Sequence, residues 1–192
     1  FSFAAGSGGS TLRGFVIGSF TANGVYVTGG DSHIIAGNWI GLARDGLTPD
    51  ANGQRGIHLA NSTGSTIGGT SDADRNVISA NSQGNLYLVN AANNIVYGNY
   101  IGTDATGLFD PDGTAYASGR SGIYLDTGAT GNQIGNTLNG ARNVIAGNNW
   151  MGVDIIQASA VNNTISGNYI GTDRTGLAAL GNAGGVSYWG AG

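Results

Sequence analysis

Two pairs of aspartates are the groups in this sequence best suited to chemistry. Asp72 and Asp74 are separated by one residue, and so are Asp110 and Asp112, in loops that also hold glycine or small residues. Alternating carboxylates in such a loop are ligands that calcium accepts, but calcium takes about six to eight oxygens, so backbone and water would have to supply the rest. Two interpretations stay open, a calcium site at these loops or turns that aspartate stabilises without an ion.

The same carboxylates could serve a polysaccharide-active enzyme, because paired carboxyl groups act as acid and base on glycosidic bonds. The long segments 41–55 and 102–121 would then form the cleft, and Arg120 would contribute to it. Against an enzyme, the sequence has no Lys and no Glu, and its two histidines, His33 and His58, fall in or beside strand-like segments where packing explains them. We therefore assign no catalytic residue.

We expect three further aspartates, Asp45, Asp104 and Asp173, to share one position of an internal repeat. A catalytic group is needed once, whereas a turn is needed in every repeat. Their repetition therefore predicts a structural role in a turn.

Three aromatic residues, Trp39, Tyr100 and Tyr169, also occupy equivalent positions, each between an Asn and an Ile. Neighbouring side chains of a strand point to opposite faces, so these rings are expected on the face opposite the isoleucines. An exposed stripe of rings would bind carbohydrate by stacking, and the alternative is a ladder of rings that stabilises the fold through contacts between successive turns.

The composition limits the classes of partner that this chain is expected to bind. Charged residues make up 9% of the chain and the net charge is −4, with the seven arginines scattered singly, so a nucleic-acid partner is not expected. No stretch approaches the roughly 20 apolar residues of a membrane span, so membrane insertion is not expected. The sequence has no Cys, which excludes disulfides and thiolate metal sites. The Asn-, Thr- and Gly-rich surface without Lys or Glu predicts an extracellular or cell-surface location.

An internal repeat dominates the sequence. The phrase Gly-Asn-Tyr-Ile-Gly-Thr-Asp-x-Thr-Gly-Leu starts at Gly98 and again at Gly167, with a degenerate copy at Gly37. A second phrase, Arg-Asn-Val-Ile, starts at Arg75 and Arg142. Taken as one strand type, the two phrases place strands near residues 14, 38, 76, 99, 143 and 168, so that short and long spacings alternate.

Two other strand types complete each turn. The second type comprises segments 24–27, 56–59, 85–88, 122–125, 153–156 and 185–188, and the third comprises 33–35, 65–67, 94–96, 132–134 and 163–165, preceded by 1–3. Three short strands per turn of about two dozen residues define a parallel β-helix. We therefore predict an all-β fold, a right-handed parallel β-helix of about six coils built as three two-coil repeats, with Asn38, Asn99 and Asn168 forming an asparagine ladder.

These phrases resemble the right-handed parallel β-helix repeats of large bacterial secreted and surface proteins, over nearly the whole chain from about Leu12 to Tyr188. The resemblance places the chain in the pectate-lyase-like superfamily, which includes polysaccharide lyases and hydrolases. It implies no particular activity, because one fold hosts many functions and neither the lyase nor the polygalacturonase pattern of catalytic residues is present.

The two ends of the predicted helix lack the caps that solenoids use to cover their open edges, so residues 1–192 are expected to form one uncapped segment. With segment 1–3 as a third-type strand and 185–188 as a second-type strand, a following copy would continue the coil in phase. We therefore expect head-to-tail contacts with copies or with flanking coils, in an extracellular fibre, sheath, stalk or adhesin shaft. The alternatives are a polysaccharide-active enzyme and a non-catalytic glycan-binding module.

Overall fold

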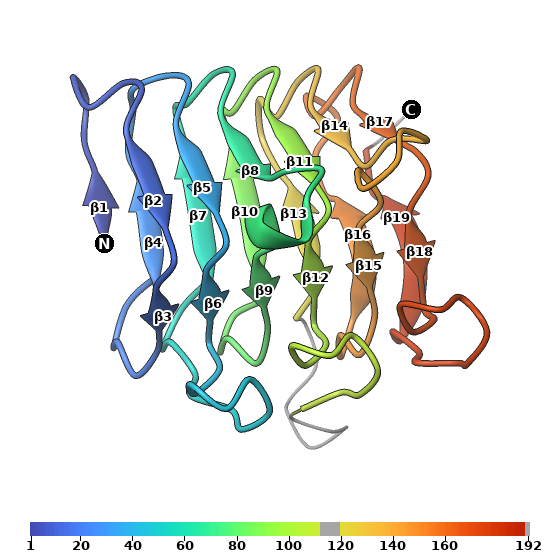
Figure 1. Ribbon diagram of the computed structural model, residues 1–192. Coiled ribbons are helices and arrows are strands. Elements are labelled where there is room, and N and C mark those ends of the chain that lie inside the picture. The colour runs from blue at the N-terminus through green and yellow to red at the C-terminus, as the bar shows by residue number, and fades with distance from the viewer. Residues whose placement is uncertain (112–119, 191–192) are drawn as a thin grey trace.

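Short apolar strands recur three times in each turn of this chain, and none is long enough to bury its apolar side alone. The computed structural model, which describes residues 1–111 and 120–190, resolves this by stacking each strand on its equivalent one turn away. The result is a right-handed parallel β-helix whose coils follow one another along the axis (Figure 1). Within these residues the structure holds one short 3-10 helix, η1 (Asp72–Asp74), and no helix with the length and apolar character to cross a membrane.

Three parallel sheets run the length of the molecule. Sheet A contains β1 (Ser2–Phe3), β4 (Val25–Val27), β7 (Ile57–Ala60), β10 (Leu86–Val89), β13 (Ile123–Leu125), β16 (Met151–Ile155) and β19 (Gly184–Tyr188). Sheet B contains β2 (Thr11–Arg13), β5 (Ile34–Ala36), β8 (Thr66–Gly68), β11 (Ile95–Tyr97), β14 (Gln133–Ile134) and β17 (Thr164–Ile165). Sheet C contains β3 (Val16–Ile17), β6 (Trp39–Ile40), β9 (Val77–Ile78), β12 (Tyr100–Ile101), β15 (Val144–Ile145) and β18 (Tyr169–Ile170).

Each coil runs through sheets A, B and C in that order, so coil 1 comprises β1 to β3 and coil 6 comprises β16 to β18. The interior is a stack of aliphatic side chains, with one column of isoleucines from sheet C that starts at Ile17 and includes Ile40, Ile78, Ile101 and Ile145. These five side chains are at most 1% exposed. The predicted fold and its six coils are therefore confirmed.

An asparagine ladder lies at the corner where the chain enters sheet C. Its members are Asn38, Asn76, Asn99, Asn143 and Asn168, one from each of coils 2 to 6. Each Nδ2 donates to the Oδ1 of the next member at 2.9–3.1 Å, and the backbone N–H of each member donates to the same Oδ1. The three predicted members are confirmed, and the Arg-Asn-Val-Ile phrase supplies the two others.

Equivalent ladders occupy the other two corners. At the entry to sheet A, amide bonds connect Asn52, Asn81, Asn85, Asn148 and Asn182 in sequence. At the entry to sheet B, amide bonds connect Asn94, Asn132 and Asn163, and in coil 3 the hydroxyl of Ser65 takes the amide's place by accepting from the His33 N–H. Side-chain amides thus satisfy buried polar groups at all three corners, where the backbone leaves the sheet ladders.

Coil 1 differs from the sequence-based expectation in two ways. Segment 1–3 was expected as a third-type strand, but β1 pairs with β4 and belongs to sheet A, and β2 is the first strand of sheet B. The register also places Phe15, not Gly14, opposite Asn38, so an aromatic residue stands at the ladder position of coil 1. Periodicity could not reveal the sheet of segment 1–3, because three residues carry too little pattern to distinguish one strand type from another.

This assignment changes the geometry of the expected head-to-tail joint. Sheet A has seven strands and begins and ends the series, whereas sheets B and C have six. If β1 of a second copy paired with β19, its β2 and β3 would lie two rungs, about 10 Å, from β17 and β18. A joint that continues all three sheets requires β1 or β19 to leave sheet A. Head-to-tail stacking of copies stays a prediction, and it would carry the free-energy cost of detaching β1 or β19 from sheet A.

The ladder makes a direct prediction about stability. Replacing Asn99 with Ala removes the amide that donates to the Ile67 and Tyr97 carbonyls and to Asn143, and it removes the Oδ1 that accepts from the buried Asn76 N–H. We expect the free energy of unfolding to fall by about 3 kcal/mol, measured by chemical denaturation. The control is Asn139→Ala at an exposed position, expected within about 0.5 kcal/mol of the wild type. Equal stability of the two variants would refute a stabilising role for the ladder.

Candidate functional site

The three aromatic residues predicted to bind carbohydrate begin strands of sheet C and point away from the isoleucine column. In register along the sheet, Trp39, Tyr100 and Tyr169 alternate with valines of the intervening coils, in the order Val16, Trp39, Val77, Tyr100, Val144 and Tyr169. They are therefore not stacked ring on ring. With Val77, Val144 and Leu42 they form a second apolar layer outside the helix core.

Loops cover this outer layer. After β6, β12 and β18 the chain makes a turn that folds back over the aromatic residue of its own strand, and in Figure 1 these are the long loops at the lower edge. A Cβ placed on Gly107 would lie 2.7 Å from the Tyr100 ring, and one on Gly176 would lie 2.8 Å from the Tyr169 ring. Both glycines have φ near +70°, so the turn needs glycine for conformation and for space.

The repeated aspartates hold these loops together. The Asp104 carboxylate accepts hydrogen bonds from the Leu108 and Phe109 N–H groups and from the Thr106 hydroxyl. Hydrogen bonds from the Thr48 hydroxyl and backbone, together with the Leu47 N–H, lower the pKa of Asp45 to about 2. The predicted turn role of these aspartates is confirmed, but the shared repeat position is wrong for Asp45. The N–H of Ala43 bonds to the carbonyl five residues later, as that of Asp104 does, so Ala43 is the residue equivalent to Asp104.

Stacking of the loops explains the two-coil period. The Ala105 N–H donates to the Gly46 carbonyl and the Arg174 N–H donates to the Gly107 carbonyl, each at 2.9 Å. Loops from coils 2, 4 and 6 thus contact one another directly. Because each loop is thicker than one coil, the intervening coils carry short turns at this corner.

Arginines cover two of the three aromatic rings from the side of the preceding coil. The Arg75 guanidinium carbon lies 4.4 Å from the centroid of Tyr100, and that of Arg142 lies 4.0 Å from the centroid of Tyr169. Tyr100 is only 6% exposed. Trp39 differs, because beside it lies an open hollow of about 270 Å³ lined by Gly14, Phe15, Val16, Gly37 and Trp39 itself.

Three of the four aspartates proposed for calcium are described, and they lie at two different corners of the coil. Asp72 and Asp74 form η1 between sheets B and C, where Asp72 contacts Arg75 at 2.5 Å and Asp74 contacts Arg13 at 2.6 Å. Asp110 lies in the loop after β12, and Asp112 lies outside the described residues. Among residues 1–111 and 120–190 no three His, Asp or other metal-binding side chains come together. Calcium binding stays a prediction that these ion pairs would oppose.

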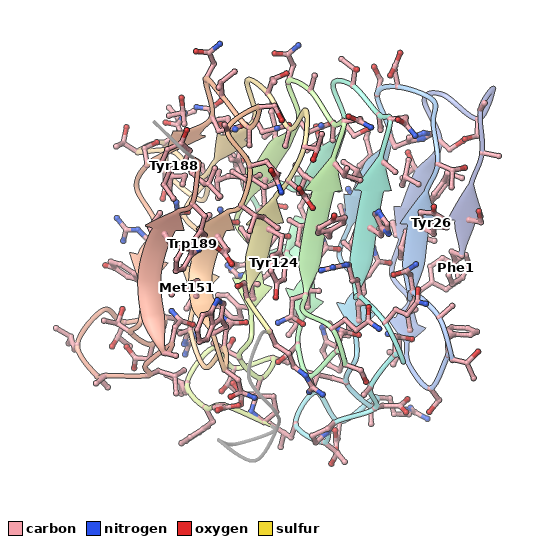
Figure 2. The ribbon with its side chains drawn as sticks, turned by 180° about the vertical axis from the view of Figure 1, so that it is seen from behind. Phe1, Tyr26, Tyr124, Met151, Tyr188 and Trp189 are labelled. Carbon is pink, nitrogen blue, oxygen red and sulfur yellow. The ribbon has the colours of Figure 1, made fainter. Side chains whose placement is uncertain are left out.

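The outward face of sheet A carries a column of ring-bearing residues that the sequence analysis did not single out. Tyr26, His58, Tyr87 and Tyr124 are in register on consecutive strands, and their ring centroids are 4.8, 4.8 and 6.0 Å apart. Figure 2 shows Tyr26 and Tyr124 on this face. The Arg55 guanidinium carbon lies 3.7 Å from the Tyr87 ring centroid. The signal was available, because each residue is the third of its second-type segment.

Packing in this column shifts proton equilibria. Burial, and then the positive charge of Arg55, lower the pKa of His58 to about 4. Burial and the hydrogen bond that the Tyr87 hydroxyl donates to Asp126 raise the pKa of Tyr87 to about 12. Beyond the rings, Asp154 continues the column and accepts hydrogen bonds from Ser187 and from the Trp189 indole. The polar and aromatic side chains of this face thus make their contacts with one another.

The geometry defines a parallel β-solenoid protein with a second apolar layer outside its coil. In comparisons with known proteins, no family model, no curated protein and no solved structure matches this chain.

The loop geometry predicts that Gly107 is far less replaceable than another glycine of the same conformation. Gly107→Ala places a methyl group against the Tyr100 ring, whereas Gly171, at φ +80°, has open space around its Cβ position. We expect Gly171→Ala to cost about 1 kcal/mol from backbone strain alone, and Gly107→Ala about 3 kcal/mol from strain and overpacking. Thermal and chemical unfolding measure both, and equal costs would show that the loop does not pack on the ring.

The lowered pKa of His58 predicts a pH dependence of stability. The unfolded chain takes up a proton near pH 6.5 but the folded protein only near pH 4, so stability is complete above about pH 6.5 and falls between pH 6.5 and 4. His58→Phe keeps a ring beside Tyr26 and Tyr87 and removes the titration. We expect the drop in melting temperature from pH 7 to pH 5 to be smaller in this variant. An unchanged drop would exclude His58 as its source.

Proposed function

We propose that this protein is a non-catalytic structural scaffold, a stiff extracellular β-solenoid of the kind that forms a shaft, stalk, sheath or adhesin. The observation that carries the proposal is the unbroken asparagine ladder from Asn38 to Asn168, which connects five consecutive coils through buried amides. A row of bonds parallel to the axis resists separation and sliding of the coils, and mechanical stiffness is the property such a row supplies.

Two further features support a structural role. The repeated motif is used for packing in every copy, since the aspartates hold turns and the aromatic rings fill the layer beneath the loops. Two of the four carboxylates suggested for an enzymatic cleft, Asp72 and Asp74, are paired with arginines at a corner away from the loops after β6 and β12 that would form the cleft. The contribution of the repeated aspartates and aromatic residues to the stability of the fold thus accounts for these sequence motifs.

The phrases shared with bacterial secreted and surface proteins support membership of the pectate-lyase-like superfamily and an extracellular location. Both are part of the proposal. The low charge of 9% and the absence of Lys, a residue that trypsin-type proteases cleave after, suit an environment rich in proteases. Within this superfamily the main competing function is polysaccharide cleavage.

The experiment combines a survival assay with an activity assay on the same protein. Purified protein is incubated with proteinase K, and separately with a panel of neutral and acidic polysaccharides analysed for released reducing ends and unsaturated products. We expect the coils to survive digestion for hours and no product above the level of heat-inactivated protein. Product formation that Asp72→Asn or Asp74→Asn abolishes, while the melting temperature is retained, would overturn the scaffold in favour of an enzyme.

A further inference from the structure

The hollow beside Trp39 occupies a position that arginine fills twice elsewhere in the molecule. Gly14, Arg75 and Arg142 each lie one residue before the ladder position of coils 1, 3 and 5, as the strand register shows. Arg75 extends over Tyr100 of the next coil, and Arg142 extends over Tyr169. In coil 1 the corresponding residue is Gly14, which has no side chain to place over Trp39.

The two occupied sites define what the position accepts. In both, the Nε–H of the arginine donates to a glycine carbonyl of the following coil, Gly98 at 3.1 Å and Gly167 at 2.9 Å, while the planar guanidinium lies over the ring. The guanidinium group of one arginine thus supplies both the hydrogen-bond donor and the cation. Guanidinium is suited to both contacts because it is planar, permanently charged and weakly hydrated.

The hollow keeps the same complementary groups. The aromatic residue is Trp39, whose ring attracts cations more strongly than tyrosine does. The carbonyl equivalent to Gly98 and Gly167 is that of Gly37, and no described residue donates a hydrogen bond to it. Phe15 and Val16, which are 45% and 48% exposed, form apolar walls against which an alkyl stem can pack.

The charges around the hollow do not oppose a cation. Arg13, the nearest positive side chain along the strand, is turned to Asp74 at 2.6 Å and donates to the Ala73 carbonyl, so its charge is compensated. The protein as a whole has a net charge of −4. A neutral ligand could pack against the apolar walls. It would not make both the cation contact with the ring and the hydrogen bond to the carbonyl, which guanidinium makes at the two equivalent positions of this molecule.

We propose that the hollow lined by Gly14, Phe15, Val16, Gly37 and Trp39 is a binding site for the guanidinium group of an arginine on a partner polypeptide. The arginine inserts its guanidinium over the Trp39 ring and donates its Nε–H to the Gly37 carbonyl. Its stem lies along Val16 and Phe15. This interaction is independent of the scaffold role, which rests on the asparagine ladder.

The test follows the Trp39 indole N–H by NMR, assigned by its loss in Trp39→Phe, while the full chain is titrated with N-acetyl-arginine N-methylamide. We expect a saturable shift of this resonance at millimolar concentrations, with the Trp150 and Trp189 resonances unchanged. The uncharged citrulline analogue has nearly the same shape, and we expect it to bind at least roughly fivefold more weakly. No shift with the arginine probe, an equal shift with citrulline, or a stronger response to methyl glucoside would overturn the proposal.

A matched variant recreates the site elsewhere. Arg142→Ala removes the guanidinium over Tyr169 and should open a second site, so the arginine probe should also shift the Tyr169 ring resonances and raise the melting temperature of this variant. The control Arg44→Ala removes the same charge from an exposed position without opening a hollow. A second site in Arg142→Ala, absent from Arg44→Ala, supports the proposal. Its absence from both variants shows that the position does not select guanidinium.

Discussion

The structure depends on the hydrogen bonding of buried corners. A β-helix turns three times per coil, and at each turn the backbone leaves the sheet and exposes N–H and C=O groups inside the protein, where an unpaired group costs about 1–3 kcal/mol. Asparagine solves this because its amide both donates and accepts and can repeat the same contact in every coil. Asn99, with bonds to the coils before and after it, shows the arrangement in full. The columns of aliphatic side chains can be continuous only because the corners are satisfied in this way.

The second layer follows from the first. Once the interior is filled by isoleucine, the residue before it in each sheet C strand points outward, and on this protein it is apolar or aromatic. The loops that follow β6, β12 and β18 fold back to cover it, and their thickness allows only one loop for every two coils. Trp39, Tyr100 and Tyr169 are therefore explained as parts of a packed layer. The hollow beside Trp39 is the one place, among the described residues of this layer, where an arginine that covers the ring in later coils is missing from the chain itself.

A scaffold and an arginine site are compatible because they use different parts of the molecule. The proposed stiffness would come from the ladders and the interior, whereas recognition would use the outer face of coils 1 and 2. Sheet A presents a contrast, since its rings lie against one another and against Arg55, and Asp154 binds the Trp189 indole. Its side chains are thus used in contacts with one another.

The sequence alone determined the fold class, the number of coils and the two-coil period, because each depends on repetition of residue type and spacing that a linear chain displays directly. It also predicted the ladder at Asn38, Asn99 and Asn168 and the turn role of Asp104. Only the tertiary structure decided the sheet to which β1 belongs, the pairing of Asp72 and Asp74 with arginines, and the covering of Tyr100. These depend on which groups of neighbouring coils meet, and the distance along the axis between two residues is set by loop lengths that bear no simple relation to their separation in sequence. The hollow over Trp39 was also decided only by the tertiary structure. Gly14 can be recognised as the residue that leaves the ring uncovered only when Arg75 and Arg142 are seen at the equivalent positions of later coils.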